Sequence, residues 1–383
     1  MRSLWNLLAV VLLLLGMTGC DPCRDLDARM APPLPSTPTP HQMVLSISGI
    51  GLSARLGDAF PEGKATRDGT TVLWDTLATK FGTAGSEAMV GLRVQREGEL
   101  TGGTFRFPIE LTSEVRGGGF ALGIEAAGDS TLTLAGGGAP GDLAPWLDSL
   151  RAGWLSELRL VTLSGWFVPG ATLALVADAP TISGGVITVP IGTSLPGAAL
   201  DAGQRAIRPG MADDFTLALS MPLLSSLARG GWKPVLRGGA PLPSRAAPDG
   251  WSLAPLPPVL AERGLEVPVL AKRADACVWT ELAVQTRPAL AAGGLGWKAP
   301  ATQRVAVHGE VTEDAALARA GLDLLALPVA RLPLLGPGDL PSEARIVRFQ
   351  GNSLLLDGVL GPIRAPRKGP RPQLPRPGLP ANP

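Results

Sequence analysis

The chain has 383 residues, and its 34 Lys and Arg nearly balance its 33 Asp and Glu, which gives a formal net charge of +1. This balance excludes the strong basic excess of a nucleic-acid-binding protein. The 49 Gly and 38 Pro argue against a helical bundle, because both residues destabilise helix interiors. The composition instead favours short strands joined by turns.

The first nineteen residues have the pattern of a secretion signal. Arg2 supplies a positive charge, and Leu4–Leu15 is mostly apolar but too short to span a bilayer. The sequence Gly16-Met17-Thr18-Gly19-Cys20 then resembles the lipobox of bacterial lipoproteins, with Met17 where leucine is commonest. That resemblance implies cleavage before Cys20 and attachment of diacylglycerol to its sulfur, so that several acyl chains of the palmitate type form a stable anchor.

An ordinary signal peptide followed by a chance cysteine is the alternative. Under the lipoprotein interpretation, the protein lies in the bacterial cell envelope, facing the periplasm or the cell surface, with the membrane as its first partner. No later stretch is apolar for the 18 residues or so that a spanning helix needs, so we expect an anchored chain that does not cross the membrane. Asp21 resembles an enterobacterial inner-membrane retention signal, but other lineages sort differently and the membrane stays open.

Three cysteines are present, and lipidation of Cys20 leaves Cys23 and Cys277. Because an exported protein with two remaining cysteines usually pairs them, we expect a Cys23–Cys277 disulfide. Two free, buried thiols are the alternative. Zinc is not expected, because only His41 and His308 could complete a site.

Two proline-rich segments bound the region that can fold. Residues 31–41 have the composition of a stiff polyproline-type spacer, so residues 20–42 are expected to hold the lipidated cysteine and a linker. The basic, proline-rich tail at 363–383 cannot bury enough apolar surface to fold and is expected to be disordered. Either it is solvated, or it rests on anionic lipid or cell-wall polymer.

The region between them contains a weak internal duplication. Leu45–Leu56 and Leu217–Ala228 each predict a strand, a serine that can cap a helix, and then a helix. Three more pairs of segments follow in the same order: 77–82 with 260–264, 92–95 with 282–285, and 182–187 with 349–354. The preserved order predicts two duplicated units at 43–200 and 214–362, joined by a linker at 201–213.

Within the first unit, apolar alternation predicts strands at 105–111, 120–124 and 131–134, which would form an antiparallel meander. Asp142 can then cap a helix. Its apolar stripe consists of Leu143, Trp146, Leu147, Leu150, Trp154 and Leu158. That stripe needs a sheet to lie on, and the meander supplies one.

A duplicated unit of strand, capped helix, antiparallel meander and second helix is similar to the tubular lipid-binding superfamily, which includes the bactericidal/permeability-increasing proteins. The resemblance covers residues 43–362, rests on pattern, and is best at the two strand–serine–helix openings. It implies a sheet wrapped round a helix, with an apolar groove for acyl chains. We therefore expect an α+β fold of two duplicated units, each a twisted antiparallel sheet packed on or wrapped round amphipathic helices.

Catalytic motifs are sparse. Gly49-Ile50-Gly51 lacks the third glycine of a dinucleotide loop, and no Gly-x-Ser-x-Gly elbow occurs. His308 lies near three acids, which would suit a metal, but it is better explained as the end of a strand before a helix that starts with Glu313 and Asp314. We therefore expect no catalytic residue, no metal site and no cofactor, and do not expect an enzyme.

The leucine-rich stretches at 259–270 and 321–335 suit either a protein core or the smooth aliphatic wall of an acyl groove. The candidate groove residues are Leu52, Leu56, Leu224, Leu227, Trp146 and Trp154. The function expected from them is an envelope lipoprotein that binds or shuttles a lipid or other amphiphile in apolar grooves. The alternative is a non-enzymatic structural or assembly lipoprotein that acts through an envelope protein partner.

Overall fold

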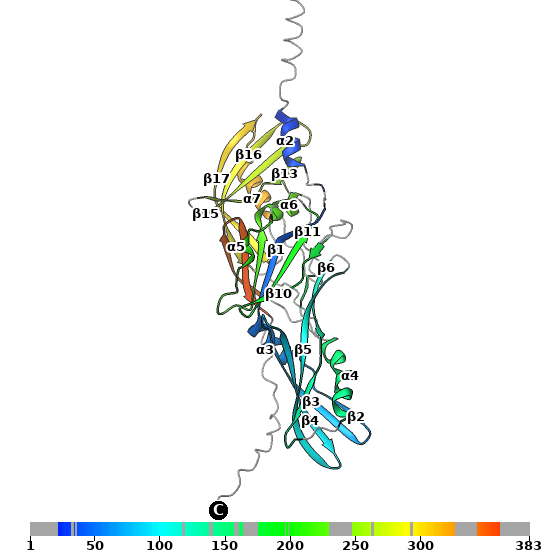
Figure 1. The fold of residues 1–383 in the computed structure, drawn as a ribbon. Helices are drawn as coiled ribbons and strands as arrows, with labels where there is room; N and C mark the ends of the chain where they lie inside the picture. Colours follow the sequence, from blue (N-terminus) through cyan, green and yellow to red (C-terminus); the bar gives the residue numbers. More distant parts are fainter. Residues whose placement is uncertain are drawn as a thin grey trace, which may run out of the picture.

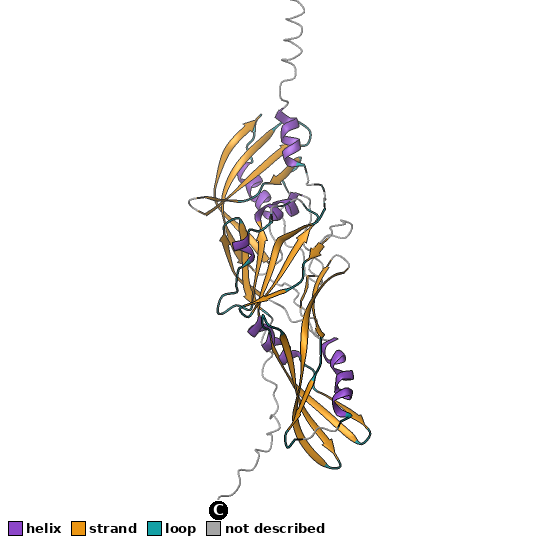
Figure 2. Cartoon of the chain, in the orientation of Figure 1, coloured by secondary structure: helices purple, strands orange, loops and turns teal. Residues whose placement is uncertain are grey.

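The computed structural model describes residues 22–31, 34, 37–116, 119–137, 141–156, 161–163, 175–195, 197, 199–229, 247–261, 264–291, 294–325 and 343–360. The fold is α+β, with three antiparallel sheets arranged along an elongated molecule (Figure 1; Figure 2). The expected signal segment, the lipidation site Cys20 and the tail at 363–383 lie outside the described residues.

A seven-stranded sheet occupies the middle of the molecule and takes strands from both expected units. Its strands, in spatial order, are β10 (Thr181–Ser183), β11 (Val186–Thr193), β1 (Thr39–Ser48), β12 (Phe215–Ser220), β19 (Ser353–Val359) and β18 (Glu343–Gln350), with β9 (Leu175–Ala177) beside β11. The two expected units therefore share this sheet.

The register of this central sheet is regular. β1 and β12 pair at its middle, where Leu45 lies opposite Leu217. On the outer sides, Leu45 lies opposite Val189 of β11, and Leu217 lies opposite Leu356 of β19. The β10–β11 and β18–β19 pairs are hairpins, as expected for residues 182–187 and 349–354.

Each central strand leads directly into a helix. β1 is followed by α3 (Gly49–Ala59), and β12 is followed by α6 (Met221–Arg229). The Oγ of Ser48 accepts a hydrogen bond from the backbone N–H of Gly51 at 3.2 Å, and the Oγ of Ser220 accepts one from Leu223 at 3.2 Å. Both predicted strand–serine–helix openings are confirmed, and each serine satisfies one of the free N–H groups of its helix.

The first lobe contains a second seven-stranded sheet. Its strands, in spatial order, are β2 (Gly63–Arg67), β3 (Thr70–Lys80), β4 (Ser86–Arg96), β5 (Glu99–Arg116), β6 (Gly119–Ala126) and β8 (Val161–Leu163), with β7 (Thr131–Leu134) beside β5. The helix α4 (Leu143–Ser156) packs against this sheet, as its apolar stripe predicts, although Leu158 of that stripe lies outside the described residues.

The expected meander needs one correction. β7 does not pair with β6; both strands pair with β5, at Phe105–Leu132 and at Ile109–Ala126. The physical reason is the length of β5, which at 18 residues offers two successive pairing sites along one edge.

The second lobe contains a five-stranded sheet. Its strands, in spatial order, are β13 (Trp251–Pro255), β15 (Gly264–Arg273), β16 (Trp279–Ala291) and β17 (Gly294–His308), with β14 (Val259–Ala261) also beside β15. The helix α7 (Asp314–Leu324) packs on one face, so closely that a Cβ added at Gly321 would lie 2.5 Å from a methyl carbon of Val269. The helix α2 (Pro22–Met30) packs against the same sheet through Leu26 and Leu270.

The expected spacer is shorter than residues 20–42. Residues 22–30 form α2, and β1 begins at Thr39. His41, which the sequence placed in the linker, lies within β1, where its Nε2 is 3.2 Å from Asp178 Oδ2. The proline-rich segment therefore connects two elements of the fold, because α2 is already docked before that segment begins.

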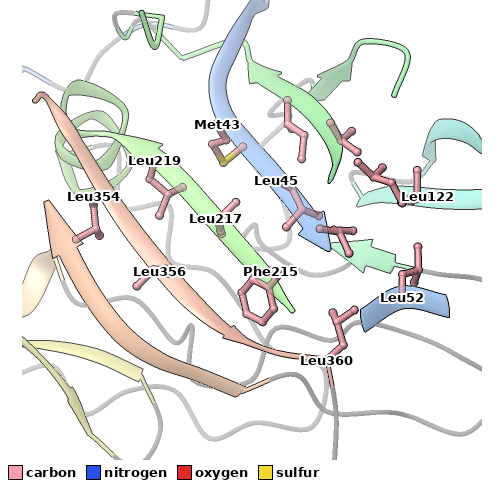
Figure 3. Packing of buried hydrophobic residues seen from close by; sticks show 14 of the residues in the cluster. Met43, Leu45, Leu52, Leu122, Phe215, Leu217, Leu219, Leu354, Leu356 and Leu360 are labelled. Carbon is pink, nitrogen blue, oxygen red and sulfur yellow. The ribbon is translucent and has the colours of Figure 1, made fainter. Parts of the chain in front are cut away.

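One continuous apolar cluster extends through both lobes and one face of the central sheet. Figure 3 shows its middle part, in which Leu45, Leu217 and Leu356 come from three neighbouring strands. A smaller cluster on the opposite face joins Val44, Ala218 and Leu355. Leu200 and Ile207 complete it from the connection between the two halves, which includes the short helix α5 (Ala202–Arg205). This connection thus covers the second face of the central sheet.

Candidate functional site

The helix α3 places Leu52 and Leu56 one turn apart on its buried face, while Ile50 on the same helix is 84 % exposed. The hydroxyl of Ser53 fixes this orientation, because it donates to the carbonyl of Thr79 in β3 at 2.6 Å. Both groove candidates of α3 therefore face the apolar interior.

The helix α6 places Leu224 and Leu227 in the same cluster from the other half of the chain. Ser225 on this helix donates a hydrogen bond of 2.8 Å to the carbonyl of Pro255, which ties α6 to β13. Leu224 and Leu227 are thus held between the central sheet and the second-lobe sheet.

The helix α4 supplies Trp146 and Trp154 to the first lobe. The ring of Trp154 lies among three other aromatic rings, with centroid separations of 5.4 Å to Trp74, 6.0 Å to Phe105 and 6.5 Å to Phe60. Its indole N–H is buried and has no hydrogen-bond partner in the described structure. A buried donor without an acceptor is costly, and the indole N–H of Trp297, which packs against the same cluster, also lacks a partner.

The six groove candidates belong to one cluster but do not form one local site. They lie on three helices, and none of their side chains is more than 9 % exposed. A ligand would reach them only if a helix moved away from its sheet. Sequence reasoning identified these positions as apolar but did not distinguish a closed core from an open groove.

An open pocket of about 290 Å³ lies elsewhere, between α2 and the second-lobe sheet. Asp27, Met30, Leu253, Lys272 and Arg273 are among its lining residues. Three of its lining residues, Asp27, Lys272 and Arg273, carry charge, which does not suit an acyl chain. The docking of α2 was not expected from the sequence, although Cys23, Leu26 and Met30 are spaced as one face of a helix.

The docking of α2 combines a covalent and several non-covalent contacts. The structure contains the expected Cys23–Cys277 disulfide, with a Cα–Cα separation of 5.9 Å. Arg29 donates two hydrogen bonds to the carboxylate of Glu281, at 2.9 and 3.0 Å, and the Nζ of Lys272 lies 2.6 Å from Asp27 Oδ1. The N-terminal helix is therefore fixed to the second lobe.

A polar cluster lies on the central sheet. Thr216 and Arg348 both donate to the buried carboxylate of Asp357, at 2.5 and 2.6 Å. Burial raises the pKa of the nearby Asp213 carboxyl; the charge of Asp357 also raises it, while Arg345 and Arg348 lower it. Since the carboxylate of Asp357 is paired with Arg348 and Thr216 within the sheet, we assign this cluster a structural role.

His308 ends β17, as expected, and stacks on Trp279 with a centroid separation of 6.2 Å. Two of the three neighbouring acids are engaged elsewhere, because Asp314 pairs with Arg304 and Glu313 accepts from the N–H of Thr312. Among the described residues, no three His, Cys, Asp or Glu side chains are grouped in a way that could hold a metal ion. No described helix combines the length and apolar character that crossing a membrane requires.

Comparisons with known proteins find little. No protein-family model matches the sequence, and no curated protein matches it. Two similar solved structures are P47 of Clostridium botulinum E1 (10 % identity, TM-score 0.34, 84 % of this chain and 100 % of that chain) and P47 from Clostridium botulinum A2 (10 %, 0.32, 83 % and 96 %). Neither is close enough to assign a fold family or a function.

Proposed function

We propose that this protein is a bacterial envelope lipoprotein, anchored through Cys20, that binds or shuttles a lipid or other amphiphile within its apolar interior. The observation that carries the proposal is the continuous cluster that extends through both lobes beneath α3, α4 and α6. The residues of this cluster are mostly aliphatic, and aliphatic side chains can pack against an acyl chain without needing hydrogen bonds.

We further propose that the two halves are duplicated units. Ser48 and Ser220 cap their helices with the same spacing, at equivalent positions of the two halves. Leu45 and Leu217 are also equivalent, and they lie opposite each other, as a two-fold axis between β1 and β12 requires. The β10–β11 and β18–β19 hairpins flank this centre in matching register. This arrangement supports the resemblance to the tubular lipid-binding superfamily.

Ligand entry in this proposal requires a helix to separate from its sheet, because the groove candidates are buried. An acyl chain would then contact α6 or α4 where side chains of the cluster pack against the helix in the closed structure. The unpartnered indole N–H of Trp154 would donate to a carbonyl or carboxyl oxygen of the ligand.

Native mass spectrometry of the mature chain without its acyl groups tests the proposal directly. A bound amphiphile would appear as an added mass that is lost on activation, and a fluorescent fatty acid should bind and be displaced by unlabelled lipid. Absence of both a co-purified lipid and fatty-acid uptake would contradict lipid binding.

A matched pair of substitutions locates the binding region. Leu224→Trp places a bulky ring in the main cluster beside α6, whereas Leu355→Trp makes the same change in the separate cluster on the other face of the central sheet. We expect Leu224→Trp to abolish fatty-acid uptake, and, because Leu224 is only 2 % exposed, to lower the melting temperature about as much as Leu355→Trp does. Leu355→Trp should keep uptake but lower the melting temperature, since overpacking costs about 1–3 kcal/mol.

A structural or assembly role through a protein partner is the second candidate. Exposed apolar side chains favour it: Val259 and Leu260 lie on β14, and Val305 and Val307 lie on β17 at the opposite edge of the second-lobe sheet. Lowered melting in both tryptophan variants, with no uptake by the unaltered protein, would favour this role.

A further inference from the structure

The docked helix α2 restricts where the lipid anchor can be. Cys23 follows Cys20 by three positions, so their Cα atoms are at most about 11 Å apart. Cys23 is fixed to Cys277 by the disulfide, and Leu26 is buried against Ala254 and Leu270 three residues later. The acyl chains are therefore held near one point of the folded protein, whatever the length of the proline-rich segment that follows.

That point lies at one end of the second lobe. Trp251 pairs with Arg273, and Trp279 pairs with both Lys272 and His308, so the strands of this sheet end together there. We name residues 247–250, 274–278 and 309–310 the proximal end. Figure 1 shows α2 at this extremity of the molecule, while β2, β3 and β4 reach the other.

We propose that the proximal end rests on the membrane surface and that the first lobe is held away from it. This inference depends on acylation of Cys20 and not on the lipid cargo. The second lobe then acts as the base. The far ends of β3, β4 and β5, where Thr70, Arg96 and Glu99 pair, become the part of the protein most distant from the anchoring bilayer.

The charges of the proximal end indicate which lipid surface it fits. Its charged residues are the acids Asp249, Asp275 and Glu310, and the adjoining positions of α2 and β15 add Arg24, Asp25 and Arg273, so that acids outnumber cations. Each cation near an anionic surface contributes about 1 kcal/mol, and each acid opposes binding. The contact is therefore imposed by the acyl chains and the disulfide, and it suits a zwitterionic surface better than an anionic one.

The disulfide has a specific part in this arrangement. The ion pairs of α2 are partly exposed and hold weakly, because water and salt screen them. Without the disulfide, α2 is held only by these ion pairs and the burial of Leu26, and when it undocks the 18 residues between Cys20 and Thr39 become a tether of roughly 60 Å. The lobes would then sample many orientations.

Energy transfer to the membrane tests the orientation. The full acylated protein is reconstituted in phosphatidylcholine vesicles that carry an acceptor-labelled lipid, with one donor dye at exposed Glu310 or at exposed Arg96. We expect efficient transfer from Glu310 and at least fivefold less from Arg96. Adding phosphatidylglycerol should not increase the transfer. The unacylated Cys20→Ser protein should give transfer at neither position.

Each other outcome has a definite meaning. Equal transfer from both positions, or greater transfer from Arg96, overturns the orientation. Failure of the acylated protein to float with the vesicles overturns the anchor and the orientation together. The Cys23→Ser/Cys277→Ser protein, checked for its fold by circular dichroism, should lose most of the difference between the two positions. A full difference in that folded variant would show that the disulfide does not orient the protein.

Discussion

Leu45 of β1 lies directly opposite Leu217 of β12, and both side chains are completely buried in the cluster that the two lobes share. A residue from each half of the chain thus completes the core of the other. Neither half of the chain forms the whole central sheet alone, so we expect the stability of one half to depend on the other.

The first prediction tests this coupling. Leu217→Ala removes apolar contacts and leaves a cavity, which costs about 2–5 kcal/mol. Because the cavity lies in the shared cluster, amide hydrogen exchange should quicken about 30-fold or more in both β4 and β16. Leu317→Ala in α7, equally buried but within the second lobe, should affect β16 more than β4. If hydrogen exchange in the Leu217→Ala protein changes in only one lobe, the proposed coupling is wrong.

The second prediction concerns the Cys23–Cys277 disulfide, whose cysteines are 254 residues apart. Loop closure of this length stabilises a fold by about 5.5 kcal/mol in the chain-entropy model. We expect Cys277→Ser to lower the urea midpoint clearly. A reductant should lower the midpoint of the unaltered protein to the same value and leave the variant unchanged. A midpoint that is insensitive to reductant would show that the covalent bond does not constrain unfolding.

The third prediction follows from Asp213. Burial and Asp357 raise its pKa in the folded state above the ordinary value of 3.8, so folding favours the protonated carboxyl. This contribution to stability is complete below pH 3.8 and is lost as the pH rises through the raised pKa. Asp213→Asn cannot ionise, and its stability relative to the unaltered protein should therefore rise from pH 3.5 to pH 7. Urea unfolding at the two pH values measures the difference, with Asp249→Asn as the control. A relative stability that falls over this range would refute the assigned direction.

The strand–serine–helix openings could be predicted from the sequence because their determinants are local: period-two alternation, a serine, and a helical run at Leu45–Leu56 and Leu217–Ala228. The pairing of β1 with β12 could not, because it joins residues far apart in the chain and alternation carries no information about partners. One of the proposed matches falls at non-equivalent places for the same reason. Leu77–Lys80 ends β3, whereas Leu260 and Gly264 lie in β14 and at the start of β15.

For the candidate site, the sequence could predict which residues are apolar and buried, but not how they are arranged. Leu52, Leu56, Leu224 and Leu227 could be recognised as inward-facing from helical spacing. Whether their helices close on the sheet depends on the shape of the interior, which no local pattern encodes. The spacing of Cys23, Leu26 and Met30 does indicate a helix with one apolar face. The prolines that follow have the composition of a linker, and for that reason the whole segment is interpreted as one from the sequence.

The last prediction separates the forces that hold α2. Leu26 is 2 % exposed and packs against Ala254 and Leu270, so Leu26→Ala should cost about 2 kcal/mol or more at this contact. Glu281→Gln instead weakens the partly exposed pair with Arg29, which is worth about 0.2–1 kcal/mol. With the disulfide intact, these losses should appear as local opening of α2 rather than global unfolding.

Hydrogen exchange within α2 should therefore quicken about 30-fold or more in Leu26→Ala and at most about fivefold in Glu281→Gln, while exchange in β4 stays unchanged in both. Trypsin cleavage after Arg24 and Arg29 should follow the same order, since cleavage requires the helix to open. A Glu281→Gln effect as large as that of Leu26→Ala would mean that the ion pair, and not apolar burial, holds the helix. Raised salt would then release α2 in the unaltered protein, whereas docking by Leu26 should leave its exchange rates nearly independent of salt.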